Sequence, residues 1–543
     1  MSDEDKDQRV RPGWPRLALG ALSGLLAGCT ALAVAEPVAA AVRPQSSPVI
    51  AVGGASIDAT PAAVKDWAIR HFGTNDKLVL QLGILVVLAV LALALGALAV
   101  RFRRIGAAGV LLFGTAGAAA AVSRPDSSSL TDALPSAVGA VAGALLLYVL
   151  VGRLTEVRRP AASASGSASE ETGDAPPASA GWDRRGFALA AASAAAASAA
   201  AGMVGRSLNA SRGQDAIASR KGLVLPSPGR PAQPVPRTAG LRVPGISSFV
   251  TPNADFYRVD TALVVPKVDA DSWRLRIHGK GVQRPGTYSF DDLLRRELIE
   301  RDITLTCVSN EVGGPYAGNA RWIGVRLADL LAECGIKPPS RGGPADQLVS
   351  RSVDGMTIGS PVEDLMDGRD AMLALGMNGE PLPFEHGFPV RMVVPGLYGF
   401  VSACKWIEDI ELTTFASYDP YWVKRGWARR APVKTASRID TPRPFARPRA
   451  GTVMVAGVAW AQHRGIDKVE VRIDDGPWRE ADLAAEDTRD TWRQWSLPWR
   501  AAKGGHTLTV RATDRTGAVQ TDRRTRTIPD GADGRHSVVV TVD

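Results

Sequence analysis

The sequence contains little cysteine and little histidine. Its 543 residues include 4 cysteines and 6 histidines. Cys29 lies in an apolar run, so at most one pair of cysteines is left for the rest of the chain, and a disulfide scaffold is excluded. No CxxC spacing indicates structural zinc, and the few scattered histidines do not favour a multi-histidine metal site.

Common hydrolase and nucleic-acid signatures are also missing. The chain has no G-x-S-x-G elbow, no H-E-x-x-H and no P-loop G-K-[ST]. Its formal net charge is +9, but the Lys and Arg residues form no basic block of the kind that binds nucleic acid. Much of the Arg content instead flanks apolar runs, which indicates a membrane.

The composition differs sharply between the two parts of the chain. Up to about residue 205 the chain is rich in Ala, Leu, Val and Gly, and beyond residue 240 it is rich in Arg, Asp, Trp and Pro. At about 150 residues per domain, the length predicts three or four units. We therefore expect a membrane section joined to a water-soluble section. A fibrous or wholly disordered chain is excluded.

Five uncharged stretches are long enough to cross a membrane, since about 20 helical residues span a hydrocarbon core. They predict a four-helix membrane section at 17–152 and a separate fifth helix. The stretches are residues 17–35, 78–100, 105–123, 133–152 and 186–205.

The distribution of Lys and Arg predicts the orientation of these helices. Arginines precede the first stretch and lie between the second and third and between the fourth and fifth, whereas the other connections are poorer in positive charge. Positive loops stay in the cytoplasm. We expect a multi-pass protein of the cell membrane with residues 1–16 in the cytoplasm and everything after residue 205 outside.

The segments around the fifth stretch carry further signals. Arg184 and Arg185 precede a mildly hydrophobic run, which resembles a twin-arginine export signal. A low-complexity cytoplasmic linker is expected at 153–185, and a flexible linker rich in Pro, Arg and Ser at 206–240. Only His71 could ligate a haem near the bilayer, and a membrane haem normally needs two histidines, so no haem is expected.

Two domains are expected after the linker. Residues 241–428 mix strands with helices: Ser289 is placed to cap a helix, and Gly335 closes an amphipathic one, which indicates an α+β domain. Residues 429–543 show short alternating strands with turns and no helical pattern, as in an all-β sandwich of immunoglobulin type. We expect its apolar faces to include Trp460, Trp478 and Trp495.

Cys307 is the first candidate for chemistry. It ends the predicted strand DITLT and opens the loop VSNEVGGPYAGN, whose Gly and Asn residues let backbone amides approach a ligand. A thiolate there could act as a nucleophile or ligate a soft metal. The alternative is a plain buried cysteine.

Several longer stretches resemble the sulfite oxidase family of molybdenum enzymes. They are TPNADFYRVDTALVVPKVDADSWRLRIHG, TLTCVSNEVGG, ARWIGVRLADLL and MNGEPLPFEHGFPVRMVVPGLYGFVSACKWIEDIEL. SRIDTP and GVAWAQHRGIDKVEVRIDDGPW similarly resemble the immunoglobulin-like C-terminal domain of that family. The resemblance covers about residues 250–543 in matching order and leaves out the membrane section.

The resemblance implies a molybdenum held by the dithiolene of a single molybdopterin, with Cys307 as metal ligand and catalytic centre. The implied cofactor contacts are Tyr257, Arg258, Ser352, His386, Arg391, Ala403 and Lys405. Arg391 would grip phosphate as a bidentate fork, and Lys405 would act as a point charge. Packing roles remain the alternative for His386 and Tyr257. Cys334 and Cys404 do not match the ligand position, and Cys334 is expected in the core.

The sequence departs from true sulfite oxidases around the substrate pocket. Glu311 and Val312 stand where the family has arginines after the cysteine, and Leu375 and Gly376 replace a tyrosine. A sulfite dianion would lose cationic partners and meet a carboxylate. The chain also lacks the haem or nucleotide domain of some relatives, so a separate electron carrier is implied.

These observations favour a membrane-anchored molybdopterin oxidoreductase that transfers an oxygen atom to or from a small molecule or a protein sulfoxide. Two alternatives stay open: a sulfite dehydrogenase with a rebuilt anion site, and a non-enzymatic surface binding protein on the same fold. A homodimer through the β-sandwich, as in many relatives, is a further expectation.

Overall fold

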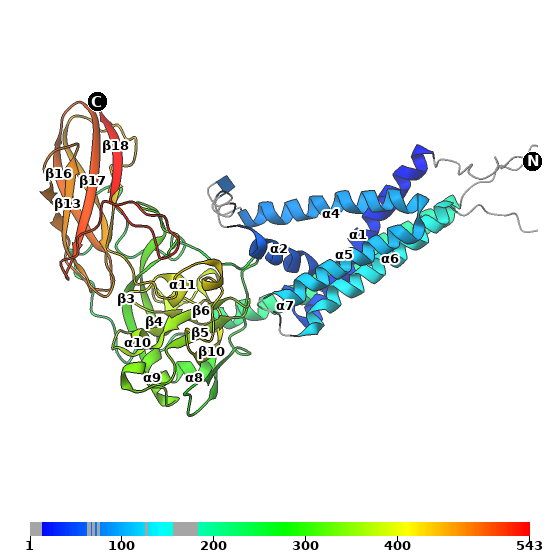
Figure 1. The fold of residues 1–543 in the computed structure, drawn as a ribbon, viewed down its shortest axis with the longest axis horizontal. Coiled ribbons are helices and arrows are strands. Elements are labelled where there is room, and N and C mark those ends of the chain that lie inside the picture. The colour runs from blue at the N-terminus through cyan, green and yellow to red at the C-terminus, as the bar shows by residue number, and fades with distance from the viewer. Residues whose placement is uncertain are drawn as a thin grey trace, which may run out of the picture. The chain divides into compact units, whose positions relative to one another are not determined.

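The computed structural model describes residues 13–61, 76–124, 129–155 and 183–543, together with 64, 67, 71, 72 and 127. The chain divides into two compact units, Met1–Arg212 and Gly213–Asp543 (Figure 1). Most of the expected N-terminal tail and of the linker at 153–185 lies outside the described residues.

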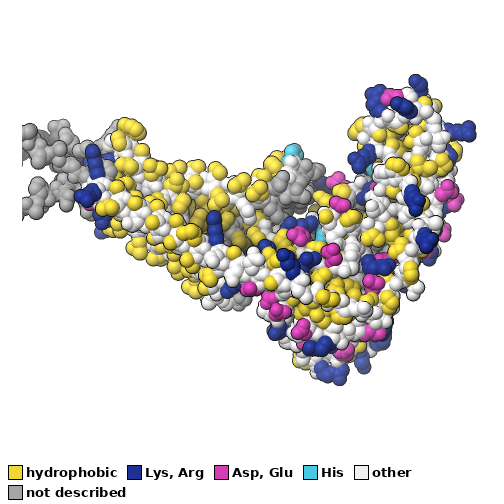
Figure 2. Space-filling view, turned by 180° about the vertical axis from the view of Figure 1, so that it is seen from behind, with side chains coloured by type: hydrophobic (Ala, Val, Ile, Leu, Met, Phe, Trp, Pro, Cys, Tyr) yellow, Lys and Arg dark blue, Asp and Glu magenta, His cyan; other side chains and the backbone are white. Residues whose placement is uncertain are grey.

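The first unit is helical. Among its described residues are five helices that are long and apolar enough to cross a membrane, and each predicted stretch falls within one of them. Figure 2 shows hydrophobic side chains covering this part of the chain, whereas Lys, Arg, Asp and Glu gather on the second unit. The helices are α1 (Trp14–Val42), α2 (Pro48–Ala59), α4 (Asp76–Arg101), α5 (Arg103–Ser123), α6 (Leu134–Thr155) and α7 (Arg184–Gly222), with 3₁₀ turns at Pro44–Ser46 and Leu130–Ala133.

Glycine allows these helices to approach closely. A Cβ at Gly24 of α1 would overlap the backbone of Ala92 and Gly96 of α4, and a Cβ at Gly96 would overlap that of Gly20. Small residues at helix contacts permit tight packing where lipid offers no hydrophobic driving force. At the edge of the unit, Arg43 donates to Asp132 at 2.8 Å, and the side chain of Asp132 is 1% exposed.

The segment after the fifth span differs from the predicted flexible linker. Helix α7 continues to Gly222, and residues 223–240 follow without helix or strand, with several apolar side chains against the core of the second unit. Leu223, Leu225 and Val235 pack on that core, and Arg230 forms a bridge with Ile299. The prediction relied on polar and Pro-rich composition, which does not reveal that a few apolar side chains are partly buried against the core.

The region from Arg274 to Thr413 combines two sheets with short helices, in agreement with the predicted α+β class. One sheet has the order β2-β1-β10-β5-β6; the other has the order β3-β4-β7-β8, and β9 pairs with β7. The strands are β1 (Arg274–Gly279), β2 (Gly286–Ser289), β3 (Leu298–Thr306), β4 (Ala317–Arg326), β5 (Gln347–Ser352), β6 (Thr357–Pro361), β7 (Met372–Met377), β8 (Glu380–Pro381), β9 (Arg391–Val393) and β10 (Ile407–Thr413). The helices are α8 (Phe290–Leu294), α9 (Leu327–Glu333), α10 (Val362–Met366) and α11 (Gly399–Ser402), and 3₁₀ turns lie at Pro339–Arg341, Phe384–His386 and Val423–Arg425.

Two local predictions in this region are confirmed. Ser289 caps α8, where its hydroxyl accepts from the Asp292 amide and the Asp292 carboxylate accepts from the Ser289 amide. Gly335 follows α9 with φ +79°, a left-handed conformation that favours glycine at a helix end.

The C-terminal region forms two antiparallel sheets of four strands each, ordered β11-β12-β16-β15 and β14-β13-β17-β18. Apolar side chains from both sheets share one core, as in a β-sandwich. The strands are β11 (Ala436–Thr441), β12 (Gly451–Trp460), β13 (Ile466–Ile473), β14 (Arg479–Glu480), β15 (Asp482–Leu483), β16 (Arg493–Ala501), β17 (Gly504–Asp514) and β18 (His536–Val542).

The three tryptophans expected in the sandwich core have different places. Trp495 is fully buried between the sheets, as predicted. Trp460 belongs to the core of the neighbouring α+β region, because it lies at the end of β12 where the two regions meet. Trp478 is partly exposed and has the guanidinium groups of Arg472, Arg511 and Arg535 within about 5 Å of its ring. Alternation along a strand could not distinguish these environments.

Candidate functional site

Cys307 lies immediately after β3, where the chain leaves the sheet. Its amide donates to the Tyr316 carbonyl at 2.9 Å, and its carbonyl accepts from the Asn310 amide at 3.0 Å. The side chain is 7% exposed, and the Ser309 amide donates to Sγ at 3.4 Å. Burial raises the pKa of the thiol, while the Ser309 hydrogen bonds and the positive charge of Lys405 oppose that shift. A thiolate here therefore needs further positive charge, such as a metal ion.

The loop after Cys307 is closed by a side chain. The Asn310 Oδ1 accepts from the Tyr316 amide at 2.8 Å, which joins the two ends of the loop. Gly313 has φ +81°, and a Cβ at Gly314 would lie 2.7 Å from that Asn310 oxygen. The Gly and Asn content noted in the sequence thus shapes a turn that holds Cys307 in place.

His386 and Arg391 lie together in the interior, each 5% exposed. His386 Nε2 is 3.0 Å from the Asn253 carbonyl, and Arg391 Nη1 donates to the His386 carbonyl at 3.1 Å. Burial lowers the pKa of His386 to about 4 and that of Arg391 to about 10. The guanidinium lies 5.0 Å from the centre of the Trp322 ring, and its Nε has no hydrogen-bond partner among the described residues.

Lys405 lies close to this pair and is held by an acidic residue. Its Nζ donates to Asp260 Oδ2 at 2.9 Å and to the Glu385 carbonyl at 3.1 Å. Burial lowers the pKa of Lys405 to about 8, although Asp260 acts in the opposite direction. Arg258 Nε also donates to Asp260 at 2.9 Å, so one buried carboxylate joins two of the predicted cofactor contacts.

Tyr257 belongs to the same buried cluster. Its ring stacks on Phe256, with centroids 5.1 Å apart, and lies 6.2 Å from the Tyr316 ring. Burial raises its pKa, with a further contribution from Cys307, and Arg391 lowers it. The phenol is thus within electrostatic reach of both the thiol and the guanidinium.

Ser352 and Ala403 lie at the margin of the cluster. Ser352 ends β5, is 2% exposed, and its Oγ accepts from the Asp354 amide at 3.5 Å. Burial raises the pKa of Asp354, and that carboxyl is within electrostatic reach of Asp260 and Lys405. Ala403 follows α11 and donates its amide to the Gly399 carbonyl at 2.9 Å. Neither side chain is therefore shown in direct contact with the cluster among the described residues. Ser352 is linked to it by Asp354, and Ala403 lies two residues before Lys405.

The other two buried cysteines, Cys334 and Cys404, are surrounded by residues of the hydrophobic core. Cys334 is 1% exposed in the main core, as predicted, and its Sγ is 3.3 Å from the Tyr288 hydroxyl. Cys404 is also buried, which raises the pKa of its thiol to about 12.

The cluster fits a buried anionic cofactor. It offers a thiol, a phenol, an imidazole and two cations that act on one another's pKa values. The Arg391 Nε is a donor left without a partner among the described residues. Gly387 has φ +111°, and a Cβ there would lie 3.0 Å from the Arg391 Cβ and 3.1 Å from the Lys405 Cβ. A glycine at this position therefore lets Arg391 and Lys405 lie close to the same turn of the backbone.

The structure also places the residues that depart from the sulfite oxidase pattern. Leu375 is fully buried in β7. A Cβ at Gly376 would overlap the side chains of Leu225 and Ile323, so no larger residue fits there. Glu311 is exposed and lines a cavity with Val312. Compared with the sulfite oxidase pattern, the chain thus lacks the tyrosine before Met377 and has the carboxylate of Glu311 in the wall of this cavity.

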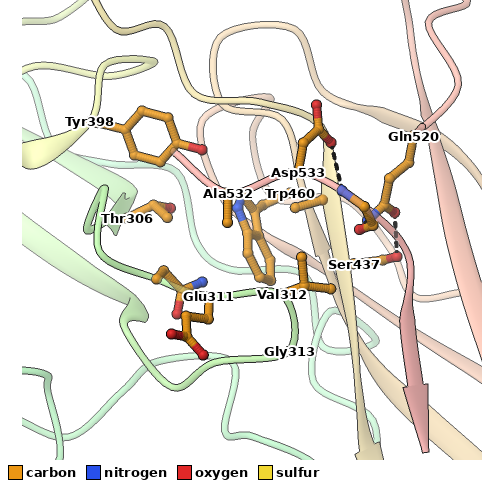
Figure 3. A pocket seen from close by; sticks show the side chains of 13 residues that line it. Thr306, Glu311, Val312, Gly313, Tyr398, Ser437, Trp460, Gln520, Ala532 and Asp533 are labelled. Carbon is orange, nitrogen blue, oxygen red and sulfur yellow. Dashed lines mark hydrogen bonds between the residues drawn. The ribbon is translucent and has the colours of Figure 1, made fainter. Parts of the chain in front are cut away.

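That cavity, of about 20 Å³, lies where the loop after Cys307 meets the sandwich (Figure 3). Sequence reasoning missed it, because residues from both regions contribute and no local pattern marks them. It also missed Asp260 and Asn253, although both stand in the segment that suggested Tyr257. The cavity is lined by Thr306, Asn310, Glu311, Val312, Gly313, Tyr398, Ala436, Ser437, Trp460, Gln520, Ala532, Asp533 and Gly534.

Comparison with known proteins identifies the same region. Residues 262–422 match the model of the oxidoreductase molybdopterin binding domain. The chain is 30% identical to mitochondrial sulfite oxidase of Rattus norvegicus over 291 residues, which is 46% of this chain and 53% of that protein. It is 26% identical to the sulfane dehydrogenase SoxCD of Paracoccus pantotrophus, covering 54% of this chain and 83% of that one, with a TM-score of 0.48.

The chain spans about half the length of the sulfite oxidases it matches. A shorter relative is matched more fully: the uncharacterized oxidoreductase YuiH of Bacillus subtilis (strain 168) is 32% identical over 162 residues, which is 30% of this chain and 75% of that protein. Together with the cluster around Cys307, these matches show that the chain belongs to the family of oxidoreductases with a molybdopterin-binding domain.

Proposed function

We propose that the chain is a membrane-anchored molybdenum oxidoreductase that carries out two-electron oxygen-atom transfer, with sulfoxide reduction as its reaction. The observation that carries this proposal is the buried cluster around Cys307, in which Lys405 lies within electrostatic reach of both the thiol and the guanidinium of Arg391. Lys405 is paired with Asp260, whereas the buried Arg391 has no carboxylate partner among the described residues, and a buried charge is costly unless it is paired.

In this proposal Cys307 is the metal ligand and catalytic centre. A thiolate is soft and donates electron density, which suits a metal that changes valence. The bound molybdopterin would supply the two-electron oxygen-transfer chemistry, and the protein would position it and tune its potential. The Nε of Arg391, which has no hydrogen-bond partner in the described part of the chain, supports a role in holding a phosphate, and the Asp260 carboxylate would orient Lys405 toward the pterin.

The remaining contacts have more peripheral roles. Tyr257 and Arg258 would close one side of the pterin, since Tyr257 lies within electrostatic reach of Cys307 and Arg258 shares Asp260 with Lys405. The neutral imidazole of His386 would offer a hydrogen bond. Ser352 and Ala403 would contribute through the backbone around them.

The proposed reaction converts a sulfoxide, two protons and two electrons into a sulfide and water. The electrons would come from a separate reduced carrier, and no haem is expected in the chain. The acidic wall at Glu311 supports a neutral substrate over an anion. Small sulfoxides and oxidised methionine on envelope proteins are both of this class.

A specific observation favours a second candidate, sulfite oxidation, because the similar proteins of Rattus norvegicus and Homo sapiens are sulfite oxidases. In that case the anion site would have been rebuilt without the arginines that follow the cysteine in the family. Turnover of sulfite with an artificial electron acceptor would distinguish the two candidates.

The location of the active region is part of the proposal. Five helices that could cross a membrane, together with the alternating positive loops, support a cell-membrane protein with a cytoplasmic N-terminus and both later domains outside. The arginine pair at the start of α7 supports export in folded form with the cofactor bound. The sandwich is proposed to be of immunoglobulin type and to mediate a homodimer.

Metal and pterin analysis of the full chain from a cofactor-competent host tests the proposal. We expect about one molybdenum and one pterin per chain, and loss of both activity and metal in Cys307→Ser. Cys334→Ser, a buried cysteine away from the cluster, is the matched control and should keep its metal. Absence of molybdenum from the unaltered chain would refute the proposal.

A further inference from the structure

The outer face of one sheet of the sandwich carries arginines gathered around a tryptophan. The guanidinium groups of Arg511, Arg472 and Arg535 lie 4.2, 5.2 and 5.2 Å from the centre of the Trp478 ring, within the range of cation–π contacts. Arg472 and Arg511 alternate with buried residues along β13 and β17, and Arg535 immediately precedes β18, the next strand of that sheet (Figure 1). Three positive charges therefore meet at one partly exposed ring.

Nearby acidic groups neutralise only part of this charge. Arg511 Nε donates to Glu470 at 2.8 Å. Arg535 Nη1 lies 3.7 Å from Asp522 Oδ2, but the Asp522 side chain is 77% exposed, so water screens that contact. Arg472 has neither an ion pair nor a hydrogen bond from its guanidinium among the described residues. The cluster thus keeps a net positive charge at the surface.

A neighbouring loop adds more positive charge. Arg523, Arg524 and Arg526 all have exposed side chains. Arg524 Nη2 donates to the Arg535 carbonyl at 3.3 Å, which places this loop beside the cluster. We call the combined surface the arginine face, and it consists of Trp478 with Arg472, Arg511, Arg523, Arg524, Arg526 and Arg535.

The arginine face borders the cavity at the loop of Cys307. Asp533 and Gly534, which directly precede Arg535, line that cavity, and so does Thr306, which directly precedes Cys307. Figure 3 shows Thr306 and Asp533 at this one cavity. A protein seated on the arginine face would therefore lie close to the proposed metal ligand without entering the cavity.

We propose that the arginine face docks an acidic electron-carrier protein. Residues 429–543 contain 21 Lys and Arg against 15 Asp and Glu, so the field of the whole sandwich attracts the same kind of partner. Electron-transfer complexes form small, weak interfaces, and charge complementarity steers their encounter. The inference rests on the proposed function and adds the kind of partner. Two reduced carriers each give up one electron, and these two electrons with two protons convert a sulfoxide into a sulfide and water.

The first experiment compares two electron donors in the turnover of dimethyl sulfoxide by the full, molybdenum-loaded chain. Reduced flavodoxin is an acidic protein that must dock, whereas reduced methyl viologen is a small cation that needs no docking surface. We expect the double variant Arg523→Glu with Arg526→Glu to lower kcat/KM for flavodoxin by roughly 10- to 100-fold at low salt and to change that for viologen by less than about twofold. Added salt should slow the flavodoxin reaction of the unaltered chain.

The second experiment measures binding without turnover. Oxidised flavodoxin is titrated onto the full chain in nanodiscs of neutral lipid, and the double variant should bind it roughly 10-fold more weakly than the unaltered chain does. The matched control is Arg449→Glu with Arg500→Glu, which makes the same charge change at two exposed residues next to β12 and on β16, in the other sheet. It should leave binding and turnover within about twofold of the unaltered chain. Loss of flavodoxin binding in nanodiscs of anionic lipid would assign the arginine face to a lipid surface and overturn the proposal.

The two experiments separate the failure of this inference from that of the proposed function. If neither donor supports turnover of the sulfoxide but flavodoxin binds in a way that depends on Arg523 and Arg526, the proposed function is wrong and the docking surface holds. If viologen supports turnover while flavodoxin does not bind, or binds and reduces the unaltered chain and the double variant alike, the docking surface is wrong. The same conclusion follows if the control variant loses as much as the double variant.

Discussion

His536 should make the stability of the second unit depend on pH. Its Nδ1 accepts a hydrogen bond from the Ile439 amide at 3.0 Å, so the folded state holds a neutral imidazole. Burial, together with Arg438 and Arg524, lowers its pKa to about 4 from an ordinary value of 6.5. Because the pKa is lower in the folded state, the unfolded chain takes up the proton at a higher pH than the folded chain does. The stabilisation is therefore complete above pH 6.5 and is lost as the pH falls through about 4.

The size of this effect follows from the two pKa values. One pKa unit corresponds to about 1.4 kcal/mol, so the full shift is worth about 3 kcal/mol, and lowering the pH from 7 to 5 should remove about 2 kcal/mol. The assay is urea unfolding of the full chain in detergent at both pH values, followed by tryptophan fluorescence. His536→Gln, whose amide oxygen can accept from Ile439, should lose about 2 kcal/mol less than the unaltered chain over this interval. Equal losses in the two proteins would refute the reasoning.

Three further predictions concern other parts of the second unit. Gly387→Ala should lower the molybdenum and pterin content, because φ is +111° and the new Cβ would press on Arg391 and Lys405; unchanged content by metal and pterin analysis would contradict this. Asp260→Asn removes the charge that orients Lys405 and should weaken retention of the pterin during dialysis, whereas Asp271→Asn at an exposed turn should have no effect. Ser289→Ala removes the cap of α8 and should lower the free energy of unfolding in urea by about 1 kcal/mol. An unchanged urea midpoint would contradict this prediction.

The apolar helices of the first unit were the part of the fold most open to prediction from sequence. A run of about 20 apolar residues has few alternatives, because every backbone polar group must be satisfied within the bilayer. The five predicted stretches accordingly fall within five apolar helices. The packing was not predictable, since the contact of Gly24 with Gly96 joins glycines far apart in the chain.

The linker at 206–240 shows the opposite case. Its Pro, Arg and Ser content predicted a flexible tether, but the segment begins in a helix and then packs Leu223, Leu225 and Val235 on the core of the second unit. Composition reports the average polarity of a segment. It does not report which few apolar side chains find a surface to cover.

The sequence by itself determined the helices, the α+β and all-β regions, the scarcity of cysteine and the family resemblance that singled out Cys307, because these depend on local pattern and residue type. Only the tertiary structure decided which groups share an environment. It brought Asp260 to Lys405, left the Arg391 Nε without a partner among the described residues, and joined Tyr398 with Trp460 from another region around one small cavity. Burial and electrostatic coupling depend on distance in space, so they emerge only when segments far apart in the chain pack together.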